Sequence, residues 1–150
     1  KYALASVPTH DLPPTAGYLQ FEHVKLREQL HLLSGPVEEF QASATDERDA
    51  MMDRLVESGL ITPEVAGDVE GHIQEIVEAM HKMLLKSPSV LLQAALVDGV
   101  GETRTQNQPG TCNEYPNWRI PLADGDGNVV PLEELFGNTR LQEIAAIMRG

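Results

Sequence analysis

The chain changes from a strand-like to a helix-like pattern of hydrophobic positions near its start. Residues 2–7 form an apolar run that stops at Pro8, which predicts a buried strand. From Thr15 onward, hydrophobic residues recur at steps of three and four, so they share one face of a helix. The members of this stripe are Leu19, His23, Leu26, Leu30 and Leu33. Ser34, Gly35 and Pro36 end the predicted helix.

Two more helices are predicted in the middle of the chain. Thr45 is a suitable N-cap for the first of them. Thr62 followed by Pro63 marks the start of the second, because proline at the first helical position gives up only an unpaired N–H. The second helix is expected to run to about Lys86 along a stripe made of Val69, Ile73, Ile76, Val77, Met80, Met83 and Leu84. The predicted helical region therefore covers residues 15–86.

A second strand-like run opens the last third of the chain. Residues 90–97 are apolar on both alternating faces, which is typical of a strand covered on both sides in a parallel sheet. A polar loop rich in Gly and Pro follows at residues 98–128, and loops of this length in compact domains are usually functional. Residues 131–149 are predicted to form two terminal helices that start near Pro131 and Asn138.

This order of elements predicts an α/β fold that is incomplete by itself. Two double-sided strands joined by a long helical crossover make at most a two-stranded parallel sheet with its edges and faces open to water. A (β/α) barrel closes such a sheet and carries its chemistry on the loops that follow the strands. The chain is therefore expected to be one predominantly helical sector of a (β/α)8 TIM barrel.

Composition and charge exclude several classes of protein. Hydrophobic residues make up 41% of the chain, which is enough for one core. A net charge of −12 repels a phosphate backbone, so no nucleic acid partner is expected. The longest charge-free apolar stretch is shorter than the roughly 20 residues of a membrane helix, and no leader pattern is visible, so neither membrane nor secretion is expected. The single cysteine, Cys112, favours a reducing, cytoplasmic location.

The densest group of chemical side chains is Thr9, His10 and Asp11, directly after the first predicted strand. A carboxylate beside an imidazole at the end of a strand is well placed to hydrogen-bond a polar substrate. The alternative is a plain turn that leads into the helix after Pro13 and Pro14, and this is the commoner use of Asp and Thr.

A second candidate group lies in the loop at residues 107–119. It contains side-chain amides, among them Asn117, together with Tyr115 and Trp118, which is the only tryptophan of the chain. Aromatic faces combined with planar amides suit sugar rings as well as protein contacts. The alternative for Trp118, and the commoner one, is that it anchors the loop on the core.

Other motifs point away from metals and nucleotides. Residues 124–128 resemble the opening of a calcium loop, but Val129 and Leu135 replace the required glycine and glutamate, so a tight polar turn is predicted instead. Residues 99–101 lack the third glycine of a dinucleotide fingerprint, because Arg104 stands in its place. The helix histidines are not spaced by one turn as a metal pair would be. No metal and no cofactor are expected.

Both candidate groups fall in segments that resemble one family. Residues 5–18, ASVPTHDLPPTAGY, look like the seventh-strand segment of bacterial 4-α-glucanotransferases, the amylomaltases. Residues 107–111, NQPGT, and 114–119, EYPNWR, are similar to the C-terminal signature of that family. The helical middle and the closing PLEEL at 131–135 also stand in the expected order. The His-Asp pair alone would not be specific, because related α-amylase-type barrels share it.

The resemblance implies an enzyme that transfers α-1,4-glucan segments with retention, using one carboxylate as nucleophile and a second as acid and base. Asp11 matches a third carboxylate, which holds sugar hydroxyls and favours the distorted transition state. His10 matches the neighbouring substrate-binding histidine, and Thr9, Asn117 and Trp118 are expected to contact the substrate. The nucleophile and the acid/base belong to earlier strands and have no counterpart here.

The resemblance also implies that the chain is the last part of a longer enzyme and that Lys1 is an interior position. It would carry the seventh and eighth strands, be inactive alone, and need the remainder of the catalytic barrel to act on a maltooligosaccharide or α-glucan. The alternative is a non-enzymatic acidic helical module that binds a protein through methionine-rich helix faces. A meeting of Asp11 and Trp118 in one cleft favours the sugar site, and a wide separation favours the module.

Overall fold

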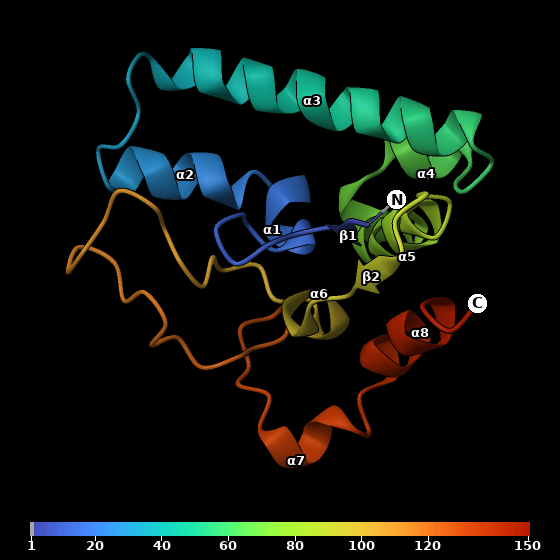
Figure 1. The fold of residues 1–150 in the computed structure, drawn as a ribbon. Helices are drawn as coiled ribbons and strands as arrows, with labels where there is room; N and C mark the ends of the chain where they lie inside the picture. The colour runs from blue at the N-terminus through green and yellow to red at the C-terminus, as the bar shows by residue number, and fades with distance from the viewer. Residues whose placement is uncertain (1) are drawn as a thin grey trace.

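The computed structural model describes residues 2–150 and shows a mostly helical chain built around a small parallel sheet. Strand β1 (Leu4–Ser6) pairs with strand β2 (Leu91–Gln93), so that Leu4 faces Leu91 and Ser6 faces Gln93. Figure 1 shows helix α3 running along the top of the molecule and helices α7 and α8 at its bottom. The parallel register brings the ends of both strands, at Ser6 and Gln93, to the same edge of the sheet.

Both strands are shorter than the apolar runs that predict them. Only three residues of the run at 2–7 are paired, and the run at 90–97 contains β2 followed by the start of helix α6 (Leu96–Val100). A short apolar run cannot by itself distinguish a strand from a buried helical turn, so the prediction merged the two elements.

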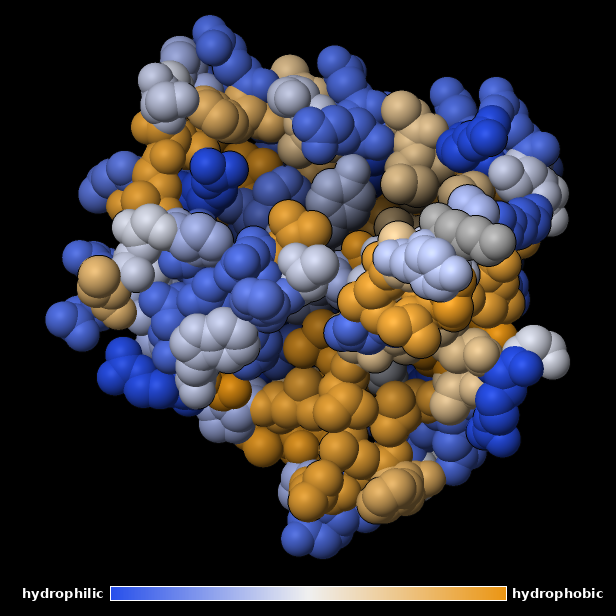
Figure 2. Space-filling model, in the orientation of Figure 1, coloured by the Kyte–Doolittle hydropathy of each residue, from blue (hydrophilic) through white to orange (hydrophobic). Residues whose placement is uncertain are grey.

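The strands lie on a face of the molecule that exposes many hydrophobic side chains. Leu4 is 57% exposed and Leu91 is 61% exposed, although the sequence predicts strands covered on both sides. A broad hydrophobic surface extends over this face from the region of the strands down to α7 (Figure 2). The other large hydrophobic residues that are exposed include Tyr2, Leu12, Val90, Leu96, Trp118, Val129, Leu132 and Phe136. Within residues 2–150, the sheet therefore has open edges and an uncovered face.

The first predicted helix is broken in two. Helix α1 (Thr15–Leu19) is followed by α2 (Glu22–Gln29), and the break falls at Phe21, which has a left-handed φ of 59°. The guanidinium of Arg48 covers the Phe21 ring at 4.3 Å and donates a 3.2 Å hydrogen bond to the carbonyl of Leu19. These contacts offset the cost of about 1–2 kcal/mol of a left-handed residue other than glycine.

Helix α3 (Val37–Glu57) begins eight residues before the predicted cap at Thr45. The hydroxyl of Thr45 donates to the carbonyl of Gln41 at 2.8 Å, so this threonine lies inside the helix and the predicted N-cap is wrong. Pro36 precedes the first turn, where Glu38 and Glu39 favour a helix N-terminus.

The predicted helix from Pro63 to Lys86 is also interrupted. Helix α4 (Pro63–Gly67) starts at the predicted cap, where the Thr62 hydroxyl accepts the N–H of Val65 at 3.4 Å. The carboxylate of Asp68 then accepts the N–H of Gly71 at 3.2 Å, and this turn separates α4 from the 3-10 helix η1 (Glu70–His72) and α5 (Ile73–Leu84). An aspartate that bonds to nearby backbone competes with a continuous helix.

The main core is formed where α1, α3, α4, α5 and the last helix meet. Its most buried members are Leu19, Met52, Leu55, Ile61, Val65, Val69, Ile76, Val77, Ala79 and Ile144. The chain ends with α7 (Leu132–Leu135) and α8 (Thr139–Ile147), close to the predicted terminal helices. Asn138 caps α8 by accepting the N–H of Leu141 at 3.1 Å. Across residues 2–150, no helix is long and apolar enough to cross a membrane.

Candidate active site

A cleft of about 620 Å³ lies at the edge of the sheet where both strands end. Its lining comes from β1 and the loop that follows it, from residues 93–97 at the end of β2 and the start of α6, and from Gln106 and Trp118 of the long loop after α6. The polar and aromatic side chains among its lining residues are Ser6, Thr9, His10, Gln93, Gln106 and Trp118. The ends of parallel strands are where barrel folds place their chemistry.

His10 and Asp11 form a close pair at the rim of this cleft. Nε2 of His10 lies 3.3 Å from Oδ2 of Asp11, and the two side chains are 65% and 52% exposed. Asn107 donates a 2.6 Å hydrogen bond from its amide to Oδ1 of Asp11, across 96 residues of sequence. The backbone does form the predicted turn, with the N–H of Leu12 bonded to the carbonyl of Thr9 at 3.1 Å. The carboxylate nevertheless contacts side chains and solvent, which leaves it accessible to a ligand.

Trp118 stands beside this pair instead of anchoring its loop on the core. Its ring centroid is 5.5 Å from that of His10 with a tilt of 42°, and the residue is 64% exposed. Its φ is 62°, and its backbone N–H donates to the carbonyl of Gln106 at 2.9 Å. Left-handed backbone at a large aromatic residue is strained, and such strain clusters at functional sites.

Asn117 holds the loop together with both atoms of its amide. Its Oδ1 accepts the N–H of Gln108 at 2.7 Å, and its Nδ2 donates to the hydroxyl of Thr111 at 2.8 Å. The hydroxyl of Tyr115 donates to the carbonyl of Thr105 at 2.6 Å, and burial raises the pKa of this phenol. These bonds fix the backbone that carries Trp118, while the contact of Asn117 with a substrate stays a prediction.

Glu102 organises the same long loop from beneath. Its buried carboxylate accepts the backbone N–H groups of Thr103, Arg104 and Ala123 at 2.9–3.0 Å. The guanidinium of Arg104 adds a forked pair of bonds at 2.9 and 2.7 Å, which raises the pKa of Arg104. Glu102 is thus fully occupied by its own chain and does not face the cleft.

The acidic turn at residues 124–128 is the tight polar turn that the sequence predicts. Oδ1 of Asp124 accepts the N–H groups of Asp126 and Asn128 at 3.0 and 2.9 Å, and its other oxygen accepts the Asn128 amide at 3.1 Å. The bonds from Asn128 lower the pKa of Asp124. The described residues 2–150 contain no group of three or more His, Cys, Asp or Glu side chains arranged to hold a metal ion.

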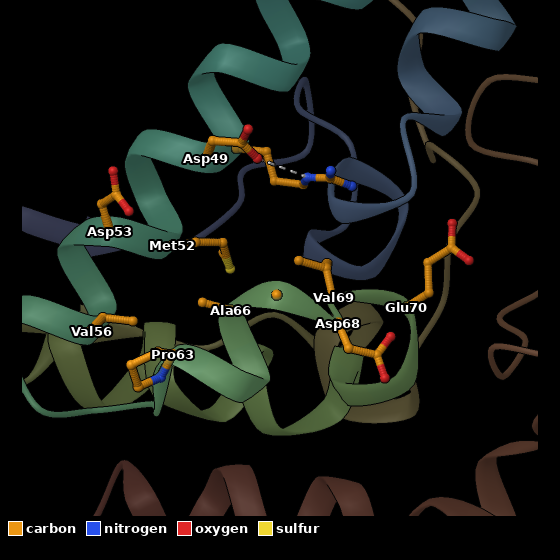
Figure 3. Close-up of a pocket in the computed structure, with 11 residues that line it drawn as sticks. Asp49, Met52, Asp53, Val56, Pro63, Ala66, Asp68, Val69 and Glu70 are labelled. Atoms are coloured by element: carbon orange, nitrogen blue, oxygen red, sulfur yellow. Dashed lines mark ion pairs between the residues drawn. The ribbon is translucent and has the colours of Figure 1, made fainter.

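A larger hollow, of about 790 Å³, lies between α3 and α4, away from the strand ends (Figure 3). Carboxylates surround it, and Arg48 pairs with Asp49 at 3.8 Å. In Figure 3, Asp53 and Glu70 lie on opposite sides of this hollow. None of the predicted site residues lines it, so the candidate active site is the smaller cleft at the strand ends.

The sequence missed three polar residues of the site as individuals. Asn107, which holds Asp11, was predicted only as the first residue of a functional loop. Gln93 ends β2 and lies opposite Ser6 in the register, so the rule that parallel strands end at one edge could have found it. Gln106 lines the cleft just before the motif, and no local signal marks it.

Comparisons with known proteins point to one family. The family model described as 4-alpha-glucanotransferase matches residues 1–125. A 4-alpha-glucanotransferase of Mycobacterium tuberculosis (strain ATCC 25618 / H37Rv) is 48% identical over 99% of this chain, and one from Haemophilus influenzae (strain ATCC 51907 / DSM 11121 / KW20 / Rd) is 28% identical over 93% of it. The crystal structure of amylomaltase from Corynebacterium glutamicum superposes on 97% of the chain with a TM-score of 0.88 and 41% identity.

The match covers only part of each relative. The chain spans 20% of the length of the curated proteins and 21% of the amylomaltase chain. With most of the chain matched by the family model, this chain belongs to the 4-alpha-glucanotransferase family and corresponds to a C-terminal fragment of its members.

Proposed function

We propose that this chain is the C-terminal part of the catalytic (β/α)8 barrel of a retaining 4-α-glucanotransferase, to which it contributes the seventh and eighth strands. The observation that carries this proposal is that His10 and Trp118 line one cleft where two parallel strands end, with Asp11 paired to His10 beside it. These residues come from two loops that lie about a hundred positions apart in the sequence. Loops that served only as turns would have no reason to bring these side chains together. The uncovered face of the sheet fits a barrel whose other strands lie outside this chain.

Asp11 is the proposed stabiliser of the transition state. Cleavage of an α-glucosidic bond passes through an oxocarbenium-like state, so a negative carboxylate gains attraction as positive charge develops on the sugar. The bond from Asn107 fixes one oxygen of Asp11, and the other oxygen faces His10. A carboxylate that is held before substrate arrives needs little reorganisation during the reaction.

His10 and Trp118 are the proposed substrate-binding side chains beside Asp11. An imidazole N–H is a donor to a sugar hydroxyl, and the exposed indole offers a flat apolar surface to the sugar ring. Thr9 lines the same cleft and has a hydroxyl for the same purpose. Asn117 acts in this proposal at the edge of the substrate site, through the loop that it holds in place.

The nucleophile and the acid/base are assigned to strands that precede this chain in the whole enzyme. Asp98 and Glu102 do not replace them, because both are buried and bonded to their own chain. The isolated chain is therefore expected to be inactive, and its partner is the remainder of the barrel. The substrate is a neutral α-glucan, so the net charge of −12 is no obstacle to binding. The proposal needs no cofactor, nucleic acid or membrane and places the enzyme in the cytoplasm.

The alternative of a helical protein-binding module has little support in the structure. Its methionine faces pack into the molecule: Met52 is buried in the core, and Met51, Met80 and Met83 are partly buried against it. A methionine buried in a core, as Met52 is, fills space and is not free to contact a partner.

The test is transfer activity of the whole enzyme on maltotriose. We expect glucose and longer maltooligosaccharides, and we expect Asp11→Asn to lower kcat by roughly three orders of magnitude or more, because it removes an interaction made in the transition state. Asp53→Asn makes the same chemical change at an exposed carboxylate of α3 and should leave turnover unchanged. Near-normal turnover of Asp11→Asn, or products from the isolated chain, would contradict the proposal.

A further inference from the structure

The buried carboxylate of Asp98 joins the first helices that follow the two strands, α1 and α6. Oδ1 and Oδ2 of Asp98, in α6, accept the backbone N–H and the hydroxyl of Thr15, at the start of α1, at 2.8 and 2.7 Å. Asp98 and Thr15 are both buried, and 83 residues separate them in the sequence. Pro14, at the N-cap of α1, provides no side-chain cap, so Asp98 performs this function from another helix.

The segment between this bond and the candidate site is short and stiff. Thr15 lies four positions after Asp11, and Pro13 and Pro14 stand between them. Proline fixes φ, so the two prolines limit how far Asp11 can move when Thr15 is held. On the other side of the bond, the first turn of α6 contributes Leu96 and Val97 to the lining of the cleft. A displacement of Asp98 would therefore shift both the loop that carries Asp11 and the first turn of α6, which lie on two sides of the site.

His81 of α5 supports Asp98 from behind. Its Nδ1 lies 2.8 Å from the carbonyl of Val77, and a carbonyl only accepts, so Nδ1 carries a hydrogen. Its Nε2 lies 3.7 Å from Oδ2 of Asp98 and has no other partner among the described residues. Burial raises the pKa of Asp98.

We propose that Asp98, supported by His81, is a positioning residue that holds Asp11 in its reactive place through the two bonds to Thr15. This inference rests on the proposed function of Asp11. It assigns no contact with substrate to Asp98, Thr15 or His81. The network acts at a distance by setting the start of α1, on which the His10–Asp11 loop is mounted.

The experiment compares two substitutions of Thr15 in the whole enzyme. Thr15→Val keeps the shape and the backbone N–H but removes the hydroxyl, whereas Thr15→Ser keeps the hydroxyl. We expect Thr15→Val to lower kcat on maltotriose about tenfold with KM changed less than about twofold, because a small misplacement of a reacting group lowers the rate and not the binding. Thr15→Ser should remain within about twofold of the wild type in both constants.

A double-mutant cycle with Asp11→Asn separates positioning from a general loss of structure. If Thr15 acts through Asp11, Thr15→Val should lower the residual rate of Asp11→Asn by less than about twofold, since the positioned group is already gone. An equal tenfold loss in both backgrounds, or equal kcat for the Val and Ser variants, would overturn the inference. Failure of the proposed function is distinguishable, because the wild-type enzyme itself would then form no transfer products.

Discussion

Residues 2–150 contain two histidine–aspartate pairs that differ in sequence separation, distance and exposure. His10 and Asp11 are neighbours in the sequence, lie 3.3 Å apart and are more than half exposed. His81 and Asp98 come from different helices, lie 3.7 Å apart and are 0% exposed. The same two residue types therefore occupy one exposed position and one fully buried position.

The difference in solvation fits the different roles that we propose for the two pairs. An exposed ion pair contributes only about 0–1 kcal/mol to stability, so His10 and Asp11 are free to exchange water for a ligand. A buried carboxylate is tolerated only when its oxygens are bonded, and Asp98 meets this condition with the two bonds from Thr15. The open pair suits binding and catalysis, and the closed pair suits architecture.

The largest expected difference between the two pairs is in their contribution to the free energy of unfolding. Asp98→Ala should lower the free energy of unfolding of the whole enzyme by about 3–5 kcal/mol, because Thr15 loses its acceptors and His81 loses its partner. Asp11→Ala should change it by less than about 1 kcal/mol. Denaturant unfolding followed by circular dichroism measures both. Equal losses would show that exposure does not decide the roles of the two pairs.

The next effect concerns α1, the helix that connects the pairs. A Cβ at Gly17 would collide with the backbone carbonyl of Thr103, so Gly17→Ala should destabilise the fold by about 1–3 kcal/mol. Gly67→Ala in α4 is the matched control, because nothing lies within 4 Å of its Cβ. The control should be neutral or slightly stabilising, since alanine is the better helix former by about 1 kcal/mol. The same denaturant titration measures both, and a stable Gly17→Ala would contradict the close approach of α1 to the loop.

A smaller effect is expected in substrate binding at the open pair. Trp118→Ala should raise KM for maltotriose about tenfold with a smaller change in kcat, because it removes an aromatic surface worth roughly 1 kcal/mol beside His10. Trp118→Phe keeps a flat ring and should stay within about threefold of the wild type. Steady-state kinetics of the whole enzyme test this, and an unchanged KM for Trp118→Ala would place the sugar elsewhere.

The smallest effect is on the pH dependence of stability, because the bonds from Thr15 and the charge of His81 oppose the desolvation of Asp98. The folded state raises the pKa of Asp98 above its ordinary value of 3.8, so it retains a proton that the unfolded chain releases. Its contribution to stability is therefore full below that value and is lost as pH rises through the folded pKa.

Asp98→Asn removes this titration, so its stability should fall less steeply than that of the wild type as pH rises above about 4. Denaturation midpoints of the two proteins across this range give the difference. Asp11→Asn serves as the open-pair control for the same charge change. Parallel curves for Asp98→Asn and the wild type would contradict a raised pKa at Asp98.

Local sequence patterns predicted the helical content and the positions of both strands. They failed at positions where a contact with a residue distant in the sequence determines the local backbone structure. The break at Phe21 depends on Arg48 of another helix, and the sequence stripe runs through it without interruption. Thr45 has the residue type of a cap, yet the helix continues on both sides of it. In the site, Asp11 and Trp118 were predicted from their motifs, whereas Asn107 as the partner of Asp11 was not.

The sequence by itself determined the adjacency of His10 and Asp11, the place of this pair after a strand, and the family to which the motifs belong. Only the tertiary structure decided that Asn107 bonds Asp11 and that Asp98 bonds Thr15, across 96 and 83 residues. Hydrophobic periodicity indicates which residues share a face within one or two turns of backbone, because local geometry determines this. The choice of a distant partner depends on how helices pack and which groups lose water, and no local pattern contains that information.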